Sequence, residues 1–352
     1  MTKLVFVTQT LDPAHGALAQ TIDLVHALAV RVDRLVVITR DDRWGQAPAN
    51  VEVKTFDAPG RASRVLAFER MLASALPGAD GALVHMVPTF LVLAAPLAKA
   101  RGIPLLLWYT HWHASRSLHI ATALCDVALS VEVTSFPIQS AKVRGIGHAI
   151  DVDEFSATPP AAHDGPVRLL ALGRTARWKG LHTLIDAFSS TELAATLEIR
   201  GPSLTADERA HRAELVEAAG LDARIRIEPA LERVAVPDLL RSVDIVVSPA
   251  EPRAGATLDK AVYEAAACAR PVVTTNAALQ GFLSGLPLEL VAPPSDPAAL
   301  AKVLSEVVLA DSITRAAIGA ELRRRVVSGH SVGHWADAVV ATVREVRSPR
   351  GG

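Results

Sequence analysis

Short runs of Val, Ile and Leu recur along the whole chain, and each run is separated from the next by a longer segment with helical periodicity. Apolar runs joined by amphipathic segments are typical of buried parallel strands that are linked by crossover helices. The sequence therefore predicts an α/β fold with doubly wound parallel sheets. The predicted strands are Leu4–Val7, Arg34–Thr39, Val51–Phe56, Ala82–His85, Pro104–Tyr109, Val127–Val131, Val167–Leu172, Thr196–Arg200, Ile225–Glu228, Ile245–Ser248, Pro271–Thr274 and Leu288–Val291.

The chain is long enough for two domains, since its 352 residues compare with roughly 100–200 residues per domain. The polar stretch Ser156–Pro166, which carries Pro159 and Pro160, is the best linker. We expect an N-terminal domain at 1–155, a linker at 156–166, a C-terminal domain at 167–330, and a C-terminal helix and tail at 331–352. Ligands of such sheets bind outside the carboxyl ends of the strands, which predicts a site in a cleft between the two domains.

Composition excludes several classes of protein. Lys and Arg number 36 against 37 for Asp and Glu, so the net charge of −1 argues against a general nucleic-acid binder. Cys125 and Cys268 lie far apart and form neither a zinc motif nor a disulfide framework, which favours a reducing cytosol. The most apolar stretch, Ala82–Ala98, contains a histidine and two prolines and is too short for a spanning helix. The N-terminus is predicted to be a first strand and not a signal peptide. We therefore expect a soluble, cytoplasmic protein.

The turn from Gly173 to Gly180 predicts an anion site. It follows the strand Val167–Leu172, precedes the predicted helix His182–Phe188 and carries Arg174 and Lys179. Helix N-terminal amides and two cationic side chains converge in such a turn, although a solvated basic loop has the same sequence pattern. No Walker lysine-serine pair and no GxGxxG follows any predicted strand, which disfavours P-loop nucleotidases and dinucleotide enzymes.

Three further places carry candidate binding groups. Lys260 and Glu264 share one face at the start of a predicted helix, where they suit a phosphate and a ribose diol or, alternatively, form an i,i+4 salt bridge. His111 follows the strand Pro104–Tyr109 and suits a sugar hydroxyl or a phosphate, the alternative being a structural histidine. Gly16 follows the first strand at the start of a predicted helix, Ala17–Val30. Backbone amides can approach a ligand there because glycine has no side chain in the way.

Taken in chain order, these pieces resemble the family 4 retaining glycosyltransferases of GT-B fold. The resemblance also includes the hinge phrase Ile146–Asp151, and it covers nearly the whole chain. Its other motifs are Gly173-Arg174 with Lys179-Gly180, Arg200-Gly201-Pro202, Asp244 through Pro249, and Glu264 through Pro271. It implies two Rossmann-like domains that face each other across a cleft, the N-terminal one on the acceptor side and the C-terminal one on the side of the nucleotide-sugar donor.

The resemblance also implies roles for the candidate residues. Arg174 and Lys179 would hold the donor diphosphate, Glu264 the ribose hydroxyls, and His111 the transferred sugar or its phosphate, which makes these four the catalytic set. Gly16, Gly173, Gly201 and Lys260 complete the donor-binding set. These enzymes generally work without a metal, so the resemblance implies a nucleoside-diphosphate sugar as co-substrate and neither cofactor nor metal. It explains Asp151-Val-Asp153, a string that holds a divalent metal in some sugar-nucleotide enzymes, as a turn at the domain junction.

The sequence departs from the family pattern at three places. The first of two glutamates that the family separates by seven residues would fall at Ala256, and the nearest upstream acid is Glu251. Main-chain amides of the loop 253–257 are candidates for its role, with Lys260 as an extra cation on the diphosphate. Ala149 and Ala269 stand where glycine is common.

The sequence thus predicts a metal-independent, retaining glycosyltransferase of hexosyltransferase type that uses a nucleoside-diphosphate sugar. The alternatives are a sugar-nucleotide epimerase of the same fold and a non-catalytic two-domain binding protein. The acceptor is a carbohydrate, a lipid-linked molecule or a small molecule. The predicted helix Arg61–Leu76 carries Arg61, Arg64 and Arg70 beside apolar residues, which suits peripheral contact with the inner face of a membrane, or else an ordinary surface helix.

Overall fold

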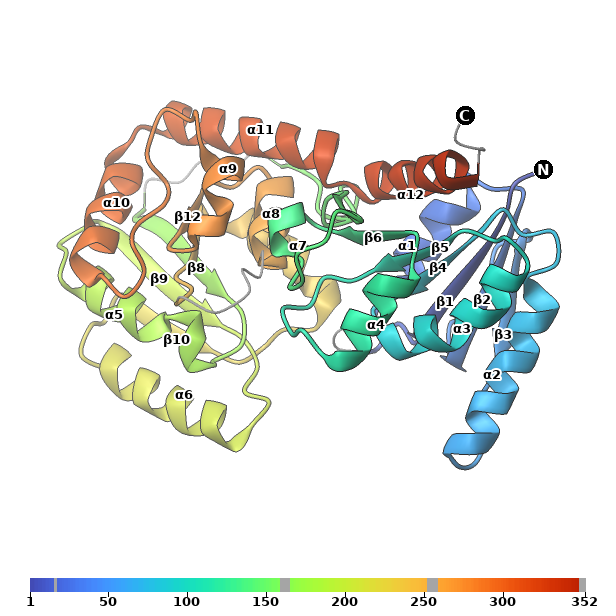
Figure 1. Ribbon diagram of the computed structural model, residues 1–352. Coiled ribbons are helices and arrows are strands. Elements are labelled where there is room, and N and C mark those ends of the chain that lie inside the picture. The colour runs from blue at the N-terminus through green and yellow to red at the C-terminus, as the bar shows by residue number, and fades with distance from the viewer. Residues whose placement is uncertain (16–17, 159–164, 252–258, 348–352) are drawn as a thin grey trace. The chain divides into compact units, whose positions relative to one another are not determined.

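The computed structural model describes residues 1–15, 18–158, 165–251 and 259–347 (Figure 1). The chain forms two compact units, unit 1 with residues 1–149 and 329–352 and unit 2 with residues 150–328. The segment Ile150–Phe155, which we assigned to the N-terminal domain, thus belongs to unit 2, and the C-terminal helix belongs to unit 1. Residues 159–164 of the predicted linker lie outside the described residues.

Unit 1 contains a seven-stranded, all-parallel sheet with the strand order β3-β2-β1-β4-β5-β6-β7. All six strands that we predicted in the first half are present, and the apolar runs of all of them except the half-buried edge strand β3 are largely buried on both faces. The short edge strand β7 was not predicted. The strands are β1 (Lys3–Leu11), β2 (Arg34–Asp42), β3 (Val51–Thr55), β4 (Gly81–His85), β5 (Leu105–Trp108), β6 (Val127–Ser130) and β7 (Val143–Gly145).

The helices of unit 1 are α1 (Thr21–Ala29), α2 (Arg61–Ala75), α3 (Pro88–Ala100), α4 (Arg116–Leu124) and α12 (Val332–Arg347). A short 3-10 helix, η1 (Val133–Ser135), follows β6. Helix α1 begins later than the predicted Ala17. The His15 ring accepts a hydrogen bond from the Leu18 amide at 3.1 Å, which fixes a turn ahead of the helix.

Helix α12 packs against α1 and the sheet of unit 1, although it follows unit 2 in the chain (Figure 1). Its Trp335 is fully buried and meets Trp108 edge-on, with 5.8 Å between the ring centroids. Its Asp337 accepts two hydrogen bonds from the Arg31 guanidinium, at 2.7 and 3.1 Å. These contacts explain why the last helix belongs to unit 1.

Unit 2 contains a five-stranded parallel sheet with the order β10-β9-β8-β11-β12, so the doubly wound α/β fold is confirmed in both units. The predicted strand Leu288–Val291 is wrong: only one isolated bridge, from Thr274 to Val291, forms there. The strands are β8 (Val167–Leu172), β9 (Ala195–Arg200), β10 (Ile225–Glu228), β11 (Ile245–Ser248) and β12 (Val272–Thr274).

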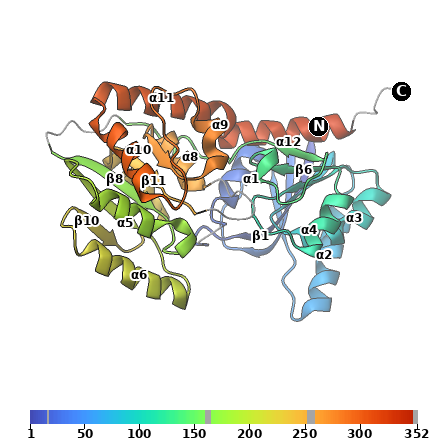
Figure 2. The same ribbon diagram turned by 60° about the vertical axis from the view of Figure 1, so that its left-hand side comes forward.

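Helix α5 (Leu181–Ser189) packs between α6 (Ala206–Ala219) and α10 (Pro297–Leu309), as Figure 2 shows. The C-terminal part of the chain forms three helices, α10, α11 (Ser312–Gly329) and α12, which are interrupted near residues 311 and 330. The remaining elements of unit 2 are η2 (Arg177–Lys179), η3 (Arg233–Ala235), α7 (Val236–Ser242), α8 (Lys260–Ala267), η4 (Ala277–Leu279) and α9 (Gln280–Leu283). None of the helices in the described part of the chain has both the length and the apolar character of a membrane span.

His85 should make the stability of unit 1 depend on pH. It ends β4, is buried, and its Nδ1 lies 2.9 Å from the Thr8 hydroxyl. Burial lowers the pKa of His85 to about 3. Burial, aided by the neighbouring His334, also lowers the pKa of His330 to about 4. Both histidines therefore stay neutral in the folded chain at pH values where they are protonated in the unfolded chain.

We expect the free energy of unfolding to fall as the pH is lowered from 7 to 5. The unfolded chain binds a proton at each histidine near pH 6.5 and the folded chain does not, so acid favours unfolding by about 2 kcal/mol per histidine at pH 5. Urea unfolding at pH 7, 6 and 5 measures this slope. His85→Gln should remove part of it, and an unchanged slope in that variant would contradict the assignment.

Candidate functional site

The carboxyl ends of β8 and β9 touch at two glycines. Gly173 follows β8 directly and its amide donates a hydrogen bond to the Arg200 carbonyl at 3.0 Å. Gly201 follows β9, and a Cβ atom at this position would overlap the Gly173 carbonyl. The predicted positions Gly173 and Gly201 are thus adjacent, and the start of the loop 173–180 depends on the missing side chain of Gly201.

Arg174 is held by a carboxylate that we did not predict. Its guanidinium forms an ion pair with Glu208 Oε1, while Glu208 Oε2 accepts the Leu204 amide at 2.6 Å. The Glu208 side chain is 7% exposed and that of Arg174 is 42% exposed. Burial alone would raise the pKa of Glu208, but the Leu204 amide and the Arg174 guanidinium outweigh it and lower this pKa. The arginine is therefore anchored to a fixed charge while much of it remains accessible.

Lys179 also has a carboxylate partner. Its Nζ lies 2.5 Å from Asp259 Oδ2 and 4.9 Å from the centroid of the Trp178 ring. The same Asp259 oxygen accepts a hydrogen bond from Ser248 Oγ at 3.1 Å, at the end of β11. Burial opposes the ionised carboxylate, but the charge of Lys179 and the hydrogen bonds from Lys179 and Ser248 together outweigh burial, so the pKa of Asp259 is lowered. Lys179 is thereby fixed beside the first residue of α8.

The Glu264 carboxylate lies close to two cations, Lys260 and Arg233. Its Oε1 is 3.0 Å from Lys260 Nζ and 3.6 Å from Arg233 Nη1, and its side chain is largely buried. The i,i+4 salt bridge that we considered as an alternative is therefore present, and a third residue, Arg233, joins it. Arg233 also pairs with Glu154 at 3.1 Å.

The candidate site residues of unit 2 form cation–carboxylate pairs. Three candidate cations, Arg174, Lys179 and Lys260, each contact a largely buried carboxylate. Sequence reasoning missed the partners of the first two. The spacing of Thr205 and Glu208, a capping-box pattern at the start of α6, was a signal for Glu208. Asp259 stands immediately before α8, where an acidic residue is favourable.

His111 belongs to unit 1. It is exposed after β5, its Nδ1 accepts the His113 amide at 3.1 Å, and its ring stacks on Trp112 with 5.4 Å between centroids. Gly16 and the loop 253–257, with Ala256, lie outside the described residues. The candidate residues therefore fall into two groups. His111 lies in unit 1, and the three ion pairs lie in unit 2.

Glu251, the nearest upstream acid to Ala256, binds the start of α5. Its Oε1 accepts the Thr183 hydroxyl at 2.9 Å and lies 3.8 Å from His182 Nε2, and its Oε2 accepts the Ser295 hydroxyl. Gly180, just before this helix, has φ +63°, and a Cβ atom there would overlap the Pro249 carbonyl. Glu251 and Gly180 thus hold the end of β11 against the end of the loop 173–180.

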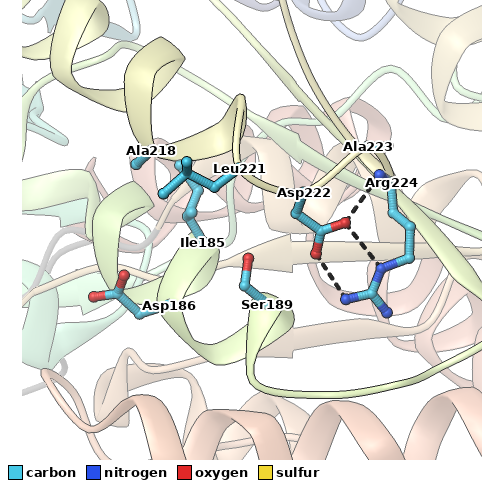
Figure 3. Close-up of a pocket in the computed structure, with 8 residues that line it drawn as sticks. All are labelled: Ile185, Asp186, Ser189, Ala218, Leu221, Asp222, Ala223 and Arg224. Atoms are coloured by element: carbon cyan, nitrogen blue, oxygen red, sulfur yellow. Dashed lines mark hydrogen bonds and ion pairs between the residues drawn. The ribbon is translucent and has the colours of Figure 1, made fainter.

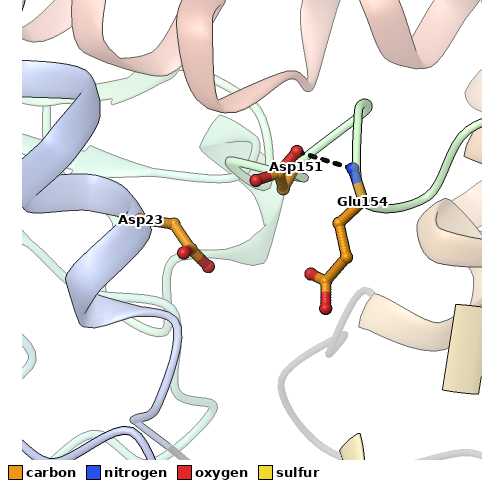
Figure 4. A group of neighbouring side chains, drawn as sticks. All are labelled: Asp23, Asp151 and Glu154. Atoms are coloured by element: carbon orange, nitrogen blue, oxygen red, sulfur yellow. Dashed lines mark hydrogen bonds between the residues drawn. The ribbon is translucent and has the colours of Figure 1, made fainter. Parts of the chain in front are cut away.

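The Asp151-Val-Asp153 string forms a local turn. Asp151 Oδ1 accepts the amides of Asp153 and Glu154, each at 3.0 Å, as Figure 4 shows for Glu154. Side chains of Asp commonly stabilise turns in this way. This geometry gives Asp151 a structural role in the turn.

A separate pocket of about 360 Å³ lies near the amino ends of β9 and β10, between α5 and α6 (Figure 3). Asp222 and Arg224 line it and pair with each other at 2.7 Å. The other lining residues are Ile185, Asp186, Ser189, Ala218, Leu221 and Ala223, so the pocket contains none of the predicted site residues. It therefore lies at the amino ends of the strands, whereas the three ion pairs lie at the carboxyl ends.

A family model matches part of the chain. Residues 166–309, in unit 2, match the family model described as glycosyl transferases group 1. A comparison with curated protein sequences finds no match.

Solved structures match nearly the whole chain. Sucrose-phosphate synthase from Thermosynechococcus elongatus is 18% identical, with a TM-score of 0.72 over 98% of this chain and 99% of that one. Alr3699/HepE of Anabaena, in complex with UDP and glucose, is 19% identical, with a TM-score of 0.74 over 98% and 100%. A glycosyltransferase from Rickettsia africae ESF-5 is 14% identical, with a TM-score of 0.76 over 99% of both chains. At these identities the likeness establishes the fold.

Replacing Lys179 by Met should destabilise unit 2, because it leaves the Asp259 carboxylate without its ammonium partner. We expect the free energy of unfolding at pH 7 to fall by roughly 1–3 kcal/mol, the usual cost of a buried polar group that loses its partner. The double variant Lys179→Met with Asp259→Asn should recover most of this loss. Chemical unfolding measures both values. Lys302→Met, at an exposed position of α10, is the control, and equal stability of the Lys179 and Lys302 variants would contradict the expectation.

Proposed function

We propose that this chain, a glycosyltransferase of the GT-B fold by its match to glycosyl transferases group 1 and by its architecture, moves a sugar from a nucleoside-diphosphate donor to an acceptor hydroxyl. We assign it to the family 4 retaining enzymes, of hexosyltransferase type. The observation that supports this donor most strongly is the set of three carboxylate-anchored cations beside the carboxyl ends of the unit 2 strands. Among proteins of the same fold, HepE is named in complex with UDP-glucose.

The chemistry follows from the leaving group. A departing nucleoside diphosphate accumulates negative charge, which Arg174, Lys179 and Lys260 stabilise as fixed cations, together with the amide end of α8. Glu264, a hydrogen-bond acceptor when ionised, binds the ribose diol. His111 contacts the transferred sugar or its phosphate. In a retaining transfer the leaving phosphate accepts the proton of the acceptor hydroxyl on the same face of the sugar.

Metal independence is part of the proposal. Cations that are already held in place supply the charge that a divalent ion would bring to the diphosphate. One oxygen of the Asp151 carboxylate, Oδ1, accepts two backbone amides in its turn. The expected co-substrate is therefore the nucleoside-diphosphate sugar alone.

We expect one donor from a panel of uridine, guanosine and adenosine diphosphate sugars to be hydrolysed slowly to its nucleoside diphosphate in the presence of chelator. Arg174→Ala should lower this rate by roughly 10²–10³, because it removes a charge that stabilises the leaving group. Chromatography of the nucleotides measures the rate. Arg177→Ala is the matched control, since it removes an exposed cation of the same loop that pairs with Glu214.

Other outcomes distinguish the alternatives. An altered sugar on an intact nucleotide would identify an epimerase. Binding without either reaction would identify a non-catalytic binding protein. Activity that disappears in chelator and returns with magnesium or manganese would contradict metal independence.

We also propose a cytoplasmic enzyme that touches the inner face of a membrane through α2. Phe68 and Leu72 of this helix pack into the core of unit 1, so they add nothing to its exposed apolar surface. Val65 and Leu66 are 40% and 52% exposed, and they lie between Arg61 and Arg70 in sequence. Apolar residues beside arginines suit the boundary of an anionic lipid surface.

Vesicles that contain anionic lipid should sediment the wild-type chain at low salt and release it at high salt. Each arginine near the surface contributes about 1 kcal/mol, and salt screens this attraction. The triple variant Arg61→Ser, Arg64→Ser and Arg70→Ser should lose the binding. Neutral vesicles are the control, and a wild type that stays in the supernatant at low salt would end this part of the proposal.

A further inference from the structure

One face of α6 carries the loop that follows β8. Glu208, His211 and Glu214 are spaced three residues apart on this helix, so they lie near one face. Glu208 pairs with Arg174, His211 Nδ1 donates to the Thr175 carbonyl at 2.8 Å, and Glu214 pairs with Arg177 at 2.6 Å. The helix and the loop are therefore joined at three successive points.

Glu208 differs from His211 and Glu214 because it lies in the first turn of α6. It is the third residue of α6, after the N-cap Thr205, whose hydroxyl accepts the Glu208 amide at 3.2 Å. A glutamate at this position usually reaches back to the start of its own helix. Here one oxygen does so, at the Leu204 amide, and the other binds Arg174. Its main-chain carbonyl also accepts the Thr175 hydroxyl at 3.1 Å.

We propose that Glu208 is a positioning residue for the donor diphosphate: it holds one part of the Arg174 guanidinium and so presents the accessible remainder to the phosphates. This inference rests on the proposed function. An arginine side chain has many rotamers, and fixing it before the ligand arrives removes an ordering cost from binding. Because Leu204 holds the second oxygen, the carboxylate stays in place when the donor binds.

An opposing effect is repulsion between the Glu208 carboxylate and the diphosphate. Two features reduce this repulsion, namely the direct ion pair with Arg174 and the amide-rich start of α6. We therefore expect the loss of orientation to outweigh the relief of repulsion when the charge of Glu208 is removed.

The test compares Glu208→Gln with Glu214→Gln, which is the same substitution on the same helix against the same loop. Calorimetric titration uses whichever of uridine, guanosine and adenosine diphosphate the wild type binds most tightly. We expect Glu208→Gln to raise the dissociation constant roughly tenfold, the scale of one charge-assisted hydrogen bond. Glu214→Gln, whose carboxylate is 54% exposed, should change it less than about twofold.

A double-mutant cycle separates positioning from a purely structural role. If Glu208 acts through Arg174, then Arg174→Ala with Glu208→Gln should bind the nucleotide no more weakly than Arg174→Ala alone. A further loss in the double variant would show that Glu208 acts on the fold of the loop and would overturn the inference. Glu208→Asp, which keeps the charge and shortens the side chain, replaces Glu208→Gln if that variant does not fold, and it should also weaken binding.

The remaining outcomes distinguish the inference from the proposed function. Nucleotide binding that is unchanged or tighter in Glu208→Gln, with a wild type that binds, overturns the role of Glu208 and leaves the glycosyltransferase proposal intact. A wild type that binds none of the three nucleoside diphosphates overturns the donor proposal, and the role of Glu208 with it.

Discussion

The close approach of two strand ends in unit 2 is the constraint on which the candidate site depends. The Gly173 carbonyl occupies the place where a side chain of residue 201 would begin, so β8 and β9 leave the sheet in contact. The loop after β8 is therefore directed over the start of α6, where Glu208 and His211 bind it. At its other end, Gly180 fits under the Pro249 carbonyl for the same steric reason. Steric contacts at the two ends of the loop thus fix the positions of Arg174 and Lys179.

Charge compensation makes such a loop stable without a ligand. Cations gathered to bind a diphosphate repel one another, and a buried carboxylate without a partner is costly. Pairing each cation with a carboxylate reduces both costs, the repulsion between cations and the burial of an unpaired carboxylate. The pairs are Arg174 with Glu208, Lys179 with Asp259, and Lys260 with Glu264. A ligand phosphate then has to bind beside these carboxylates or displace them. The two cases predict opposite effects of removing a carboxylate on nucleotide affinity, which is why conservative amide substitutions are informative.

The sequence predicted the parts of the fold that depend on local pattern. Continuous apolar runs located the central strands because both faces of these strands are buried, and the glycines of the loop 173–180 were recognisable because they follow a strand. Contacts between distant residues were not recognisable in the same way. The capping-box spacing marks Glu208 as a residue at the start of a helix, but nothing in the sequence pairs it with Arg174. The apolar face of α12 likewise does not indicate which unit it covers. The strand predicted at Leu288–Val291 failed because an apolar run alone does not supply a partner strand for more than one bridge.

Two departures from the expected family pattern show that surroundings, and not residue type alone, determine local conformation. Ala149 and Ala269 stand where glycine was expected, and both have φ +57°, the left-handed conformation that glycine adopts most easily. An alanine pays roughly 1–2 kcal/mol for it. At Ala269 the reason is visible: Gly319 of α11 packs so closely that a Cβ atom there would overlap the Ala269 carbonyl. The turn thus keeps its conformation because α11 packs on its backbone, so a missing family residue does not by itself imply a changed backbone.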